Sequence, residues 1–109
     1  MNYKLYTIDN QFIEEVAYVN PKFTGIVVHP GNVGIKEYLV NGKNHRTDGP
    51  SVIWSDGTKF WCINDKNHRF DGPAIEWADG KRFYYIYGKR VTKEQHALLV
   101  DIMNLKGLA

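Results

Sequence analysis

The sequence predicts an α+β protein that is mainly β. We expect an antiparallel meander of about six strands, built from repeated β-hairpins, with a short N-terminal helix and a C-terminal capping helix. The main observation is a duplication: residues 44–57 return as residues 67–80 with nine of fourteen residues identical, a period of 23 residues. Such a period indicates copies of one supersecondary unit stacked side by side. Within each copy, two runs of β-forming residues flank an Asp-Gly pair, which favours a hairpin.

Length and composition fit one domain, residues 1–109. The 109 residues are 43% hydrophobic and 14% aromatic, which is enough apolar material for a modest core. The formal charge of +2 is too small to indicate nucleic-acid binding by itself. The single cysteine cannot form an intrachain disulfide, and no apolar run resembles a signal peptide or a membrane span. We therefore expect a cytoplasmic protein without a membrane role.

Residues 1–22 are expected to cap the array at its N-terminal end. Residues 3–8 alternate and are rich in β-forming types, which predicts a strand. Asp9 is then placed to N-cap a helix through about residue 19, because the apolar residues that follow share one face at helical spacing. The competing interpretation makes residues 12–19 a second strand.

The hairpin repeats occupy residues 23–91, and the first copy is atypical because residues 29–34 replace the Asp-Gly turn. We favour a two-residue type I′ turn, which pairs Trp54 with Lys59 and Trp77 with Arg82. A three-residue loop with Gly57 in a bulge would shift this pairing by one residue. The favoured register predicts one sheet face made of Val52, Trp54, Trp61, Ile63, Ile75, Trp77, Tyr84 and Ile86.

Residues 92–109 predict the C-terminal helix. Thr92 at the N-cap and Gln95 three positions later form a capping box, and the helix is expected to end near Leu105. Its apolar residues fall at helical spacing, so we expect them to cover the last hairpin where a further repeat would otherwise pack. This stripe consists of Leu98, Leu99, Ile102, Met103 and Leu105.

The period and the spacing Asn41-Gly42-Lys43-x-His45-x-x-x-Gly49 resemble MORN-type repeats over about residues 24–95. The chain is more similar still to a variant with His-Arg-x-Asp-Gly-Pro and Trp-x-Asp-Gly that occurs in small phage and bacterial proteins. It departs from standard MORN units by an arginine after each histidine and a proline after each glycine. The resemblance implies a hairpin-repeat scaffold for interactions, without a shared catalytic residue.

The two corners with the sequence His-Arg-x-Asp-Gly-Pro are the most specific candidates for a site. Histidine, arginine and a carboxylate could perform acid-base chemistry, but a catalytic site needs one constellation and this set occurs twice. We therefore favour a structural role, in which each aspartate accepts loop N–H groups or pairs with the arginine or histidine. Repeated ligand binding and catalysis are the alternatives. The corner residues are His45, Asp48, Gly49, Pro50, His68, Asp71, Gly72 and Pro73.

We expect no enzyme activity, no metal site and no cofactor. The histidines and Cys62 lack the short spacings of metal ligands, and no phosphate loop or nucleophile motif is present. The first functional hypothesis is a non-enzymatic protein-interaction module, a phage-encoded factor that binds and modulates a host protein in the host cytoplasm. The open sheet edges also allow a homodimer.

The second functional hypothesis is nucleic-acid binding through a basic and aromatic sheet surface, because single strands are held by aromatic side chains interleaved with cations. The alternative interpretation of the same residues is a solvated rim around core aromatics. Candidate partner-binding residues under either hypothesis are Arg46, Arg69, Lys59, Lys81, Arg82, Lys89, Arg90, Phe60, Phe83 and Tyr85.

Overall fold

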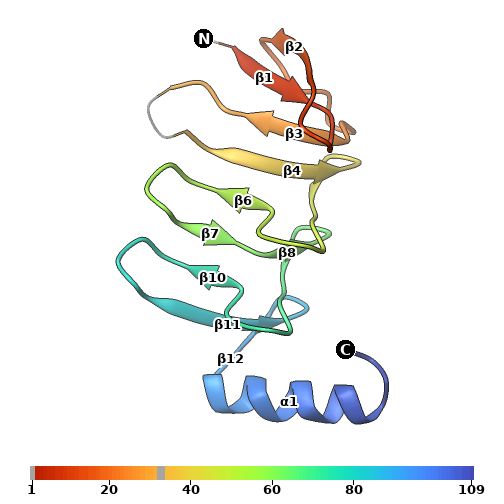
Figure 1. Cartoon of the computed structure of the whole chain (residues 1–109), viewed down its shortest axis with the longest axis vertical. Coiled ribbons are helices and arrows are strands. Elements are labelled where there is room, and N and C mark those ends of the chain that lie inside the picture. The colour runs from red at the N-terminus through yellow and green to blue at the C-terminus, as the bar shows by residue number, and fades with distance from the viewer. Residues whose placement is uncertain (1, 32–33) are drawn as a thin grey trace.

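The computed structural model describes residues 2–31 and 34–109, and in it the chain forms a long antiparallel sheet with one helix at the C-terminal end (Figure 1). The strands are β1 (Tyr3–Tyr6), β2 (Phe12–Val16), β3 (Gly25–Val28), β4 (Lys36–Val40), β5 (Lys43–Asn44), β6 (Val52–Ile53), β7 (Lys59–Phe60), β8 (Cys62–Ile63), β9 (Lys66–Asn67), β10 (Ile75–Glu76), β11 (Arg82–Ile86) and β12 (Lys89–Val91). The helix is α1 (Lys93–Leu105). The predicted mainly β meander is confirmed, with more and shorter strands than expected.

The hairpins stack along the longest dimension of the molecule, which measures 45 × 31 × 20 Å (Figure 1). The strand order is β12-β11-β10-β7-β6-β4-β3-β1-β2, with β5 beside β4, and β8 and β9 form a separate ribbon. One equivalent position is completely buried in every unit, namely Ile26, Ser51 and Ala74 at 1%, 0% and 0% exposure. The backbones of neighbouring hairpins meet at these positions, and this identifies equivalent residues in the three units.

The predicted N-terminal helix does not form. A turn replaces its start, because Asn10 takes a positive φ of 72° and its N–H donates to the Thr7 carbonyl at 2.9 Å. The chain then returns as β2, as in the competing strand interpretation. Strand β2 pairs with the edge of β1 that β3 leaves open, so both edges of β1 are hydrogen-bonded. A helix here would have left those backbone groups without ladder partners.

The favoured hairpin register is wrong, and the three-residue loop is correct. Ile53, not Trp54, opposes Lys59, and the Trp54 N–H closes the loop at 2.9 Å. Within the loop of residues 55–57, only Gly57 has a positive φ, of 96°. The Asp56 carboxylate accepts the N–H two residues further on at 2.8 Å, so the aspartate supports the loop from its side chain instead of adopting the left-handed conformation. Asp79 does the same in the next unit at 3.0 Å.

Two-residue turns with two positive φ angles occur at the opposite end of each hairpin. They lie at Asn41-Gly42, Asn64-Asp65 and Tyr87-Gly88. The second residue of each turn donates its N–H to the preceding unit, at 2.8 Å in all three cases. A Cβ on Gly42 would lie 1.7 Å from a backbone oxygen of Pro21, so only glycine fits there. These turns join each unit to the one before it.

The shifted register distributes the residues of the predicted sheet face over both sides of the sheet. Trp54, Phe60 and Trp77 contact one another with ring centroids 5.5–5.9 Å apart, and we call their side the tryptophan face. Successive strand residues point to opposite sides. Trp61 therefore lies on the other side, which we call the corner face. Tyr38 and Tyr84 are the equivalent aromatic residues of the neighbouring units on this face.

The predicted capping box of α1 is confirmed. The Gln95 N–H donates to the Thr92 hydroxyl at 3.0 Å, and the Thr92 N–H donates to the Gln95 side chain at 2.9 Å. The helix packs on β11, but the predicted apolar stripe does not cover the hairpin. His96 is the buried helix residue, and most of the stripe is exposed. No helix in the described part of the chain is long and apolar enough to cross a membrane.

Candidate functional site

Each His-Arg-x-Asp-Gly-Pro corner folds over the corner face and encloses its own arginine. The Arg69 guanidinium lies over the Trp61 ring, 3.9 Å from its centroid. It donates from Nε to Asp71 at 2.8 Å and from Nη1 to the Pro73 carbonyl at 3.1 Å. The preceding corner repeats the arrangement, with Arg46 over Tyr38 at 4.0 Å. Each arginine therefore uses a π face, a carboxylate and a carbonyl of its own unit.

The glycine of the corner gives the guanidinium room. A Cβ on Gly72 would lie 2.8 Å from Cζ of Arg69, and a Cβ on Gly49 would lie 2.9 Å from Cζ of Arg46. The side chains of Arg46 and Arg69 are only 24% and 20% exposed. Their donors point into the corner, so neither residue forms a free cationic surface. This geometry favours a structural role for both arginines.

The corner histidines hold the turn of the following ribbon. The Tyr87 N–H donates to Nδ1 of His68 at 2.8 Å, and the Asn64 N–H donates to Nδ1 of His45 at 3.2 Å. His68 is buried, and its ring stacks on that of Tyr87 with centroids 3.8 Å apart. The accepting nitrogen must be unprotonated to make this bond. The structure therefore requires neutral imidazole at position 68.

We expect the free energy of unfolding to decrease as the pH falls below about 6.5, because of His68. Burial, and secondarily the nearby His96, lower the pKa of His68 below its ordinary value. The unfolded chain therefore binds a proton first as the pH falls. The contribution of His68 is complete above about pH 6.5 and is lost towards its lower folded-state pKa. Urea unfolding at several pH values measures the slope of the free energy of unfolding against pH.

The matched variant is His68→Asn, which keeps an acceptor near the Tyr87 N–H but cannot titrate. It should flatten the slope in this pH range, whatever its effect on absolute stability. Asp71 does not interfere, because its hydrogen bond from Arg69 holds its pKa below the usual range and its contribution is lost only in stronger acid. An unchanged slope in His68→Asn would show that another group causes the pH dependence.

The predicted basic and aromatic surface does not form as one surface. Lys59 and Phe60 are consecutive in β7, and Arg82 and Phe83 are consecutive in β11, so within each pair the two side chains point to opposite faces. Lys59 and Arg82 are the two cross-strand partners of Glu76, so all three side chains share one face. Nε of Arg82 lies 3.9 Å from the Glu76 carboxylate. Cations and aromatic rings are therefore mostly on different sides.

Of the remaining candidates, Arg90 is the one cation that the structure brings onto an aromatic ring of the predicted surface. Its guanidinium lies 4.3 Å from the centroid of Phe83. Tyr85 pairs with Arg90 across β11 and β12. Lys81 and Lys89 are exposed, and Lys81 lies 3.7 Å from the Asp79 carboxylate. Together these residues form only a small group at the C-terminal end of the sheet.

The candidate functional site is instead the side of α1 that faces away from the sheet. Leu98, Ile102 and Leu105 follow one another at spacings of four and three residues, and they are 62%, 41% and 89% exposed. At 100° per residue they lie on the opposite side of the helix from His96, Val100 and Met103. Leu99, which is 36% exposed, lies at the border. We call Leu98, Ile102 and Leu105 the outer helix face.

His96 explains why the helix adopts this orientation. Its ring lies 5.0 Å from that of Tyr84, and its Nε2 lies 2.6 Å from the Arg69 carbonyl oxygen. Tyr84 is equivalent to Tyr38 and Trp61, whose rings are covered by the corner arginines. The position 23 residues after Arg69 is Thr92, so the last unit has no corner arginine. His96 occupies the place over Tyr84, and the leucines are left outside.

The sequence contained one signal for this arrangement that the apolar periodicity concealed. The aromatic position is retained in the last unit while its arginine partner is absent, so another side chain must cover Tyr84.

Within the described ranges, no group of three or more His, Cys, Asp or Glu side chains could hold a metal ion. No family model matches the chain, and neither a curated protein nor a solved structure matches it.

Proposed function

We propose that this protein is a non-enzymatic interaction module that inserts the outer helix face of α1 into an apolar groove of a partner protein. The observation that carries the proposal is the exposure of Leu98, Ile102 and Leu105 on the side of α1 turned away from its own sheet. Aliphatic residues at positions i, i+4 and i+7 are the pattern by which amphipathic helices dock into grooves. An apolar helix side without a cover within its own fold favours a partner.

The sheet serves in this proposal as a rigid support for the helix. The capping box orders the first turn of α1, and the contact of His96 with Tyr84 and the Arg69 carbonyl connects that turn to the last unit. A helix that is already formed and held loses less conformational freedom on binding than a disordered peptide. Glu94 and Asp101 border the outer helix face, which favours a partner groove with basic residues at its rim.

The proposal includes a cellular setting. The resemblance of the repeats to those of small phage and bacterial proteins favours a host protein as the partner. The single cysteine and the absence of a disulfide requirement favour the cytoplasm as the place of binding. A second copy of the chain, joined through the same helix side, is the competing occupant of this surface.

The triple variant Leu98→Gln, Ile102→Gln, Leu105→Gln tests the proposal. Gln is nearly as good a helix former as leucine, and these side chains are exposed, so the free energy of unfolding should change by less than about 1 kcal/mol. Partner affinity should fall by about 100-fold or more, because buried aliphatic anchors dominate such interfaces. The measurement is affinity purification from lysate with nuclease, followed by titration with the recovered partner.

The matched control replaces exposed aliphatic residues at the other end of the sheet, Ile8→Gln and Ile13→Gln, which are 54% and 46% exposed in the native chain. This variant should retain the partner. Recovery of the same partner by the triple variant would refute the helix as the docking site. A doubled mass in light scattering that the triple variant loses would identify a second copy as the occupant, and material removed by nuclease would favour nucleic acid.

A further inference from the structure

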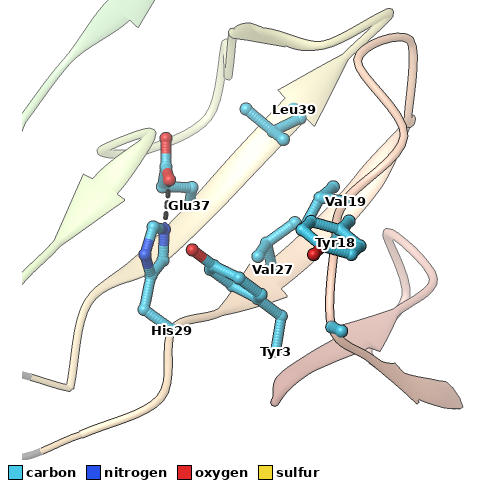
Figure 2. A pocket seen from close by; sticks show the side chains of 8 residues that line it. Tyr3, Tyr18, Val19, Val27, His29, Glu37 and Leu39 are labelled. Atoms are coloured by element: carbon cyan, nitrogen blue, oxygen red, sulfur yellow. Dashed lines mark hydrogen bonds and ion pairs between the residues drawn. The ribbon is translucent and has the colours of Figure 1, made fainter. Parts of the chain in front are cut away.

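A pocket of about 430 Å³ opens on the tryptophan face near the N-terminal end of the sheet, far along the chain from α1 (Figure 2). Figure 2 shows His29 and Glu37 joined along one side of this pocket and Val19 with Tyr18 along the opposite side. Tyr3 lies between them. The pocket is lined by Tyr3, Ala17, Tyr18, Val19, Val27, His29, Glu37 and Leu39.

The strand pairing shows that Glu37 breaks an otherwise apolar row. Cross-strand partners share a face, and the pairs connect the row residues one after another across the sheet. Between Leu5 and Phe83, Glu37 is the one charged residue of the row. The row consists of Leu5, Val27, Glu37, Val52, Phe60, Ile75 and Phe83.

His29 occupies the place of the tryptophans. Its N–H closes the first hairpin by donating to the Ile35 carbonyl at 2.8 Å, as the N–H groups of Trp54 and Trp77 close the later hairpins. Each of these residues follows its row residue by two positions, so all three point to the tryptophan face. In the second unit Trp54 contacts Phe60 with centroids 5.6 Å apart. In the first unit the same two positions hold an imidazole and a carboxylate.

The fold does not require this polar pair. The later units show that a tryptophan and a phenylalanine fit the same positions, and a partly buried ion pair often stabilises a protein less than apolar residues of similar volume. The side chains of His29 and Glu37 are 29% and 22% exposed, so both are substantially withdrawn from water. A local departure from the repeat that reduces apolar packing is a signal of a binding function.

The chemistry of the pocket favours a cation with an apolar stem. Oε1 of Glu37 contacts Nε2 of His29, and within the described residues Oε2 has no hydrogen-bond partner. The half-buried ring of Tyr3 packs edge-on against His29 with centroids 5.1 Å apart, and the exposed Tyr18 adds a second ring. Phenol rings attract cations through their faces. Val27 and Leu39 are buried and form an apolar wall for an alkyl chain.

We propose that this pocket binds an alkylammonium or alkylguanidinium group, with Glu37 as counter-ion and His29 as the side chain that orients the carboxylate. The ligand has two sources with the same chemistry, a free amine or the lysine or arginine side chain of a protein. The site is separate from α1, so it stands or falls independently of the proposed helix docking.

The experiment is an NMR titration of the full-length, ¹⁵N-labelled protein with n-butylammonium chloride, and with n-butanol as the neutral analogue. We expect saturable shift changes at Tyr3, Val19, Val27 and Glu37, and affinity for the ammonium at least tenfold higher than for the alcohol. Equal affinity for the two probes, or shift changes elsewhere on the chain, would overturn the proposal. This comparison uses the native protein, so it does not depend on whether a variant folds.

The variants Glu37→Gln and Glu15→Gln localise the charge effect. Glu15 is an exposed carboxylate on the opposite face of the sheet, in the edge strand β2, so its replacement controls for the loss of one negative charge. Glu37→Gln should weaken n-butylammonium binding at least tenfold, and Glu15→Gln should leave it unchanged. Equal weakening by both variants would contradict a specific counter-ion role.

A second arm distinguishes the two sources of the cation. Blocked lysine, N-acetyl-lysine-N-methylamide, carries the same ammonium on a peptide-like backbone. Binding of both blocked lysine and n-butylammonium would support a protein side chain as the ligand. Binding of n-butylammonium alone would support a free amine, because the backbone is then excluded by the pocket walls. Binding of neither would refute the proposal.

Discussion

Replacement of Arg69 by alanine should lower the free energy of unfolding by about 2–3 kcal/mol. Arg69 lies over Trp61 and bonds to Asp71 and to the Pro73 carbonyl, and its Nη1 lies 3.4 Å from a carboxylate oxygen of Glu76. Alanine removes the cation from the ring and leaves the carbonyl and the Glu76 carboxylate without this partner. Chemical denaturation at neutral pH measures the loss.

Two further variants assign the loss to the corner geometry. Arg69→Lys should recover little of it, because an ammonium cannot reproduce the planar fork that bonds to a carboxylate and a carbonyl while covering a ring. Arg82→Ala is the surface control and should change stability by less than about 0.5 kcal/mol. Full rescue by lysine would show that only the positive charge matters at this position.

The double variant His29→Trp, Glu37→Phe should raise the free energy of unfolding by about 1–3 kcal/mol. It converts the polar pair of the first hairpin into the aromatic pair of the second, where Trp54 and Phe60 contact each other. The pocket beside His29 offers room for the larger rings. Thermal and urea unfolding of the variant and the native protein provide the measurement.

The same double variant should lose the response to n-butylammonium, because both the counter-ion and the open pocket are removed. A gain in stability together with a loss of binding would show that the first hairpin gives up packing for a site. The single variant Glu37→Phe is the internal control, since it removes the carboxylate but leaves His29 without its partner, and it should stabilise less than the pair. A destabilised double variant would contradict the equivalence of the hairpins.

The architecture was largely predictable from the sequence because it rests on local and repeated signals. The period of 23 residues identifies the hairpin unit, and the capping box of Thr92 and Gln95 defines where the helix begins. These features depend on residues a few positions apart, so no distant contact is needed to recognise them. The pairing of Asp48 with Arg46 and of Asp71 with Arg69 was also among the predicted corner contacts, and both pairs are present.

The hairpin register was not predictable in this way. Both candidate turns suit an Asp-Gly pair, and they differ by one residue in the pairing. The choice depends on hydrogen bonds from Asp56 and Asp79 and on the aromatic contacts of Trp54 with Phe60 and Trp77 across units. One residue of shift moved Trp61 to the other face and separated the predicted cations from the aromatic rings.

The repeat, the sheet and the presence of the C-terminal helix follow from local sequence patterns. Tertiary structure alone decided that residues 12–16 form a strand, because β1 has an open edge there that a helix could not satisfy. It also decided which side of α1 faces outward, because His96 covers Tyr84 in place of the missing corner arginine. Local patterns specify elements, whereas the side that an element buries depends on the partner that the rest of the fold presents.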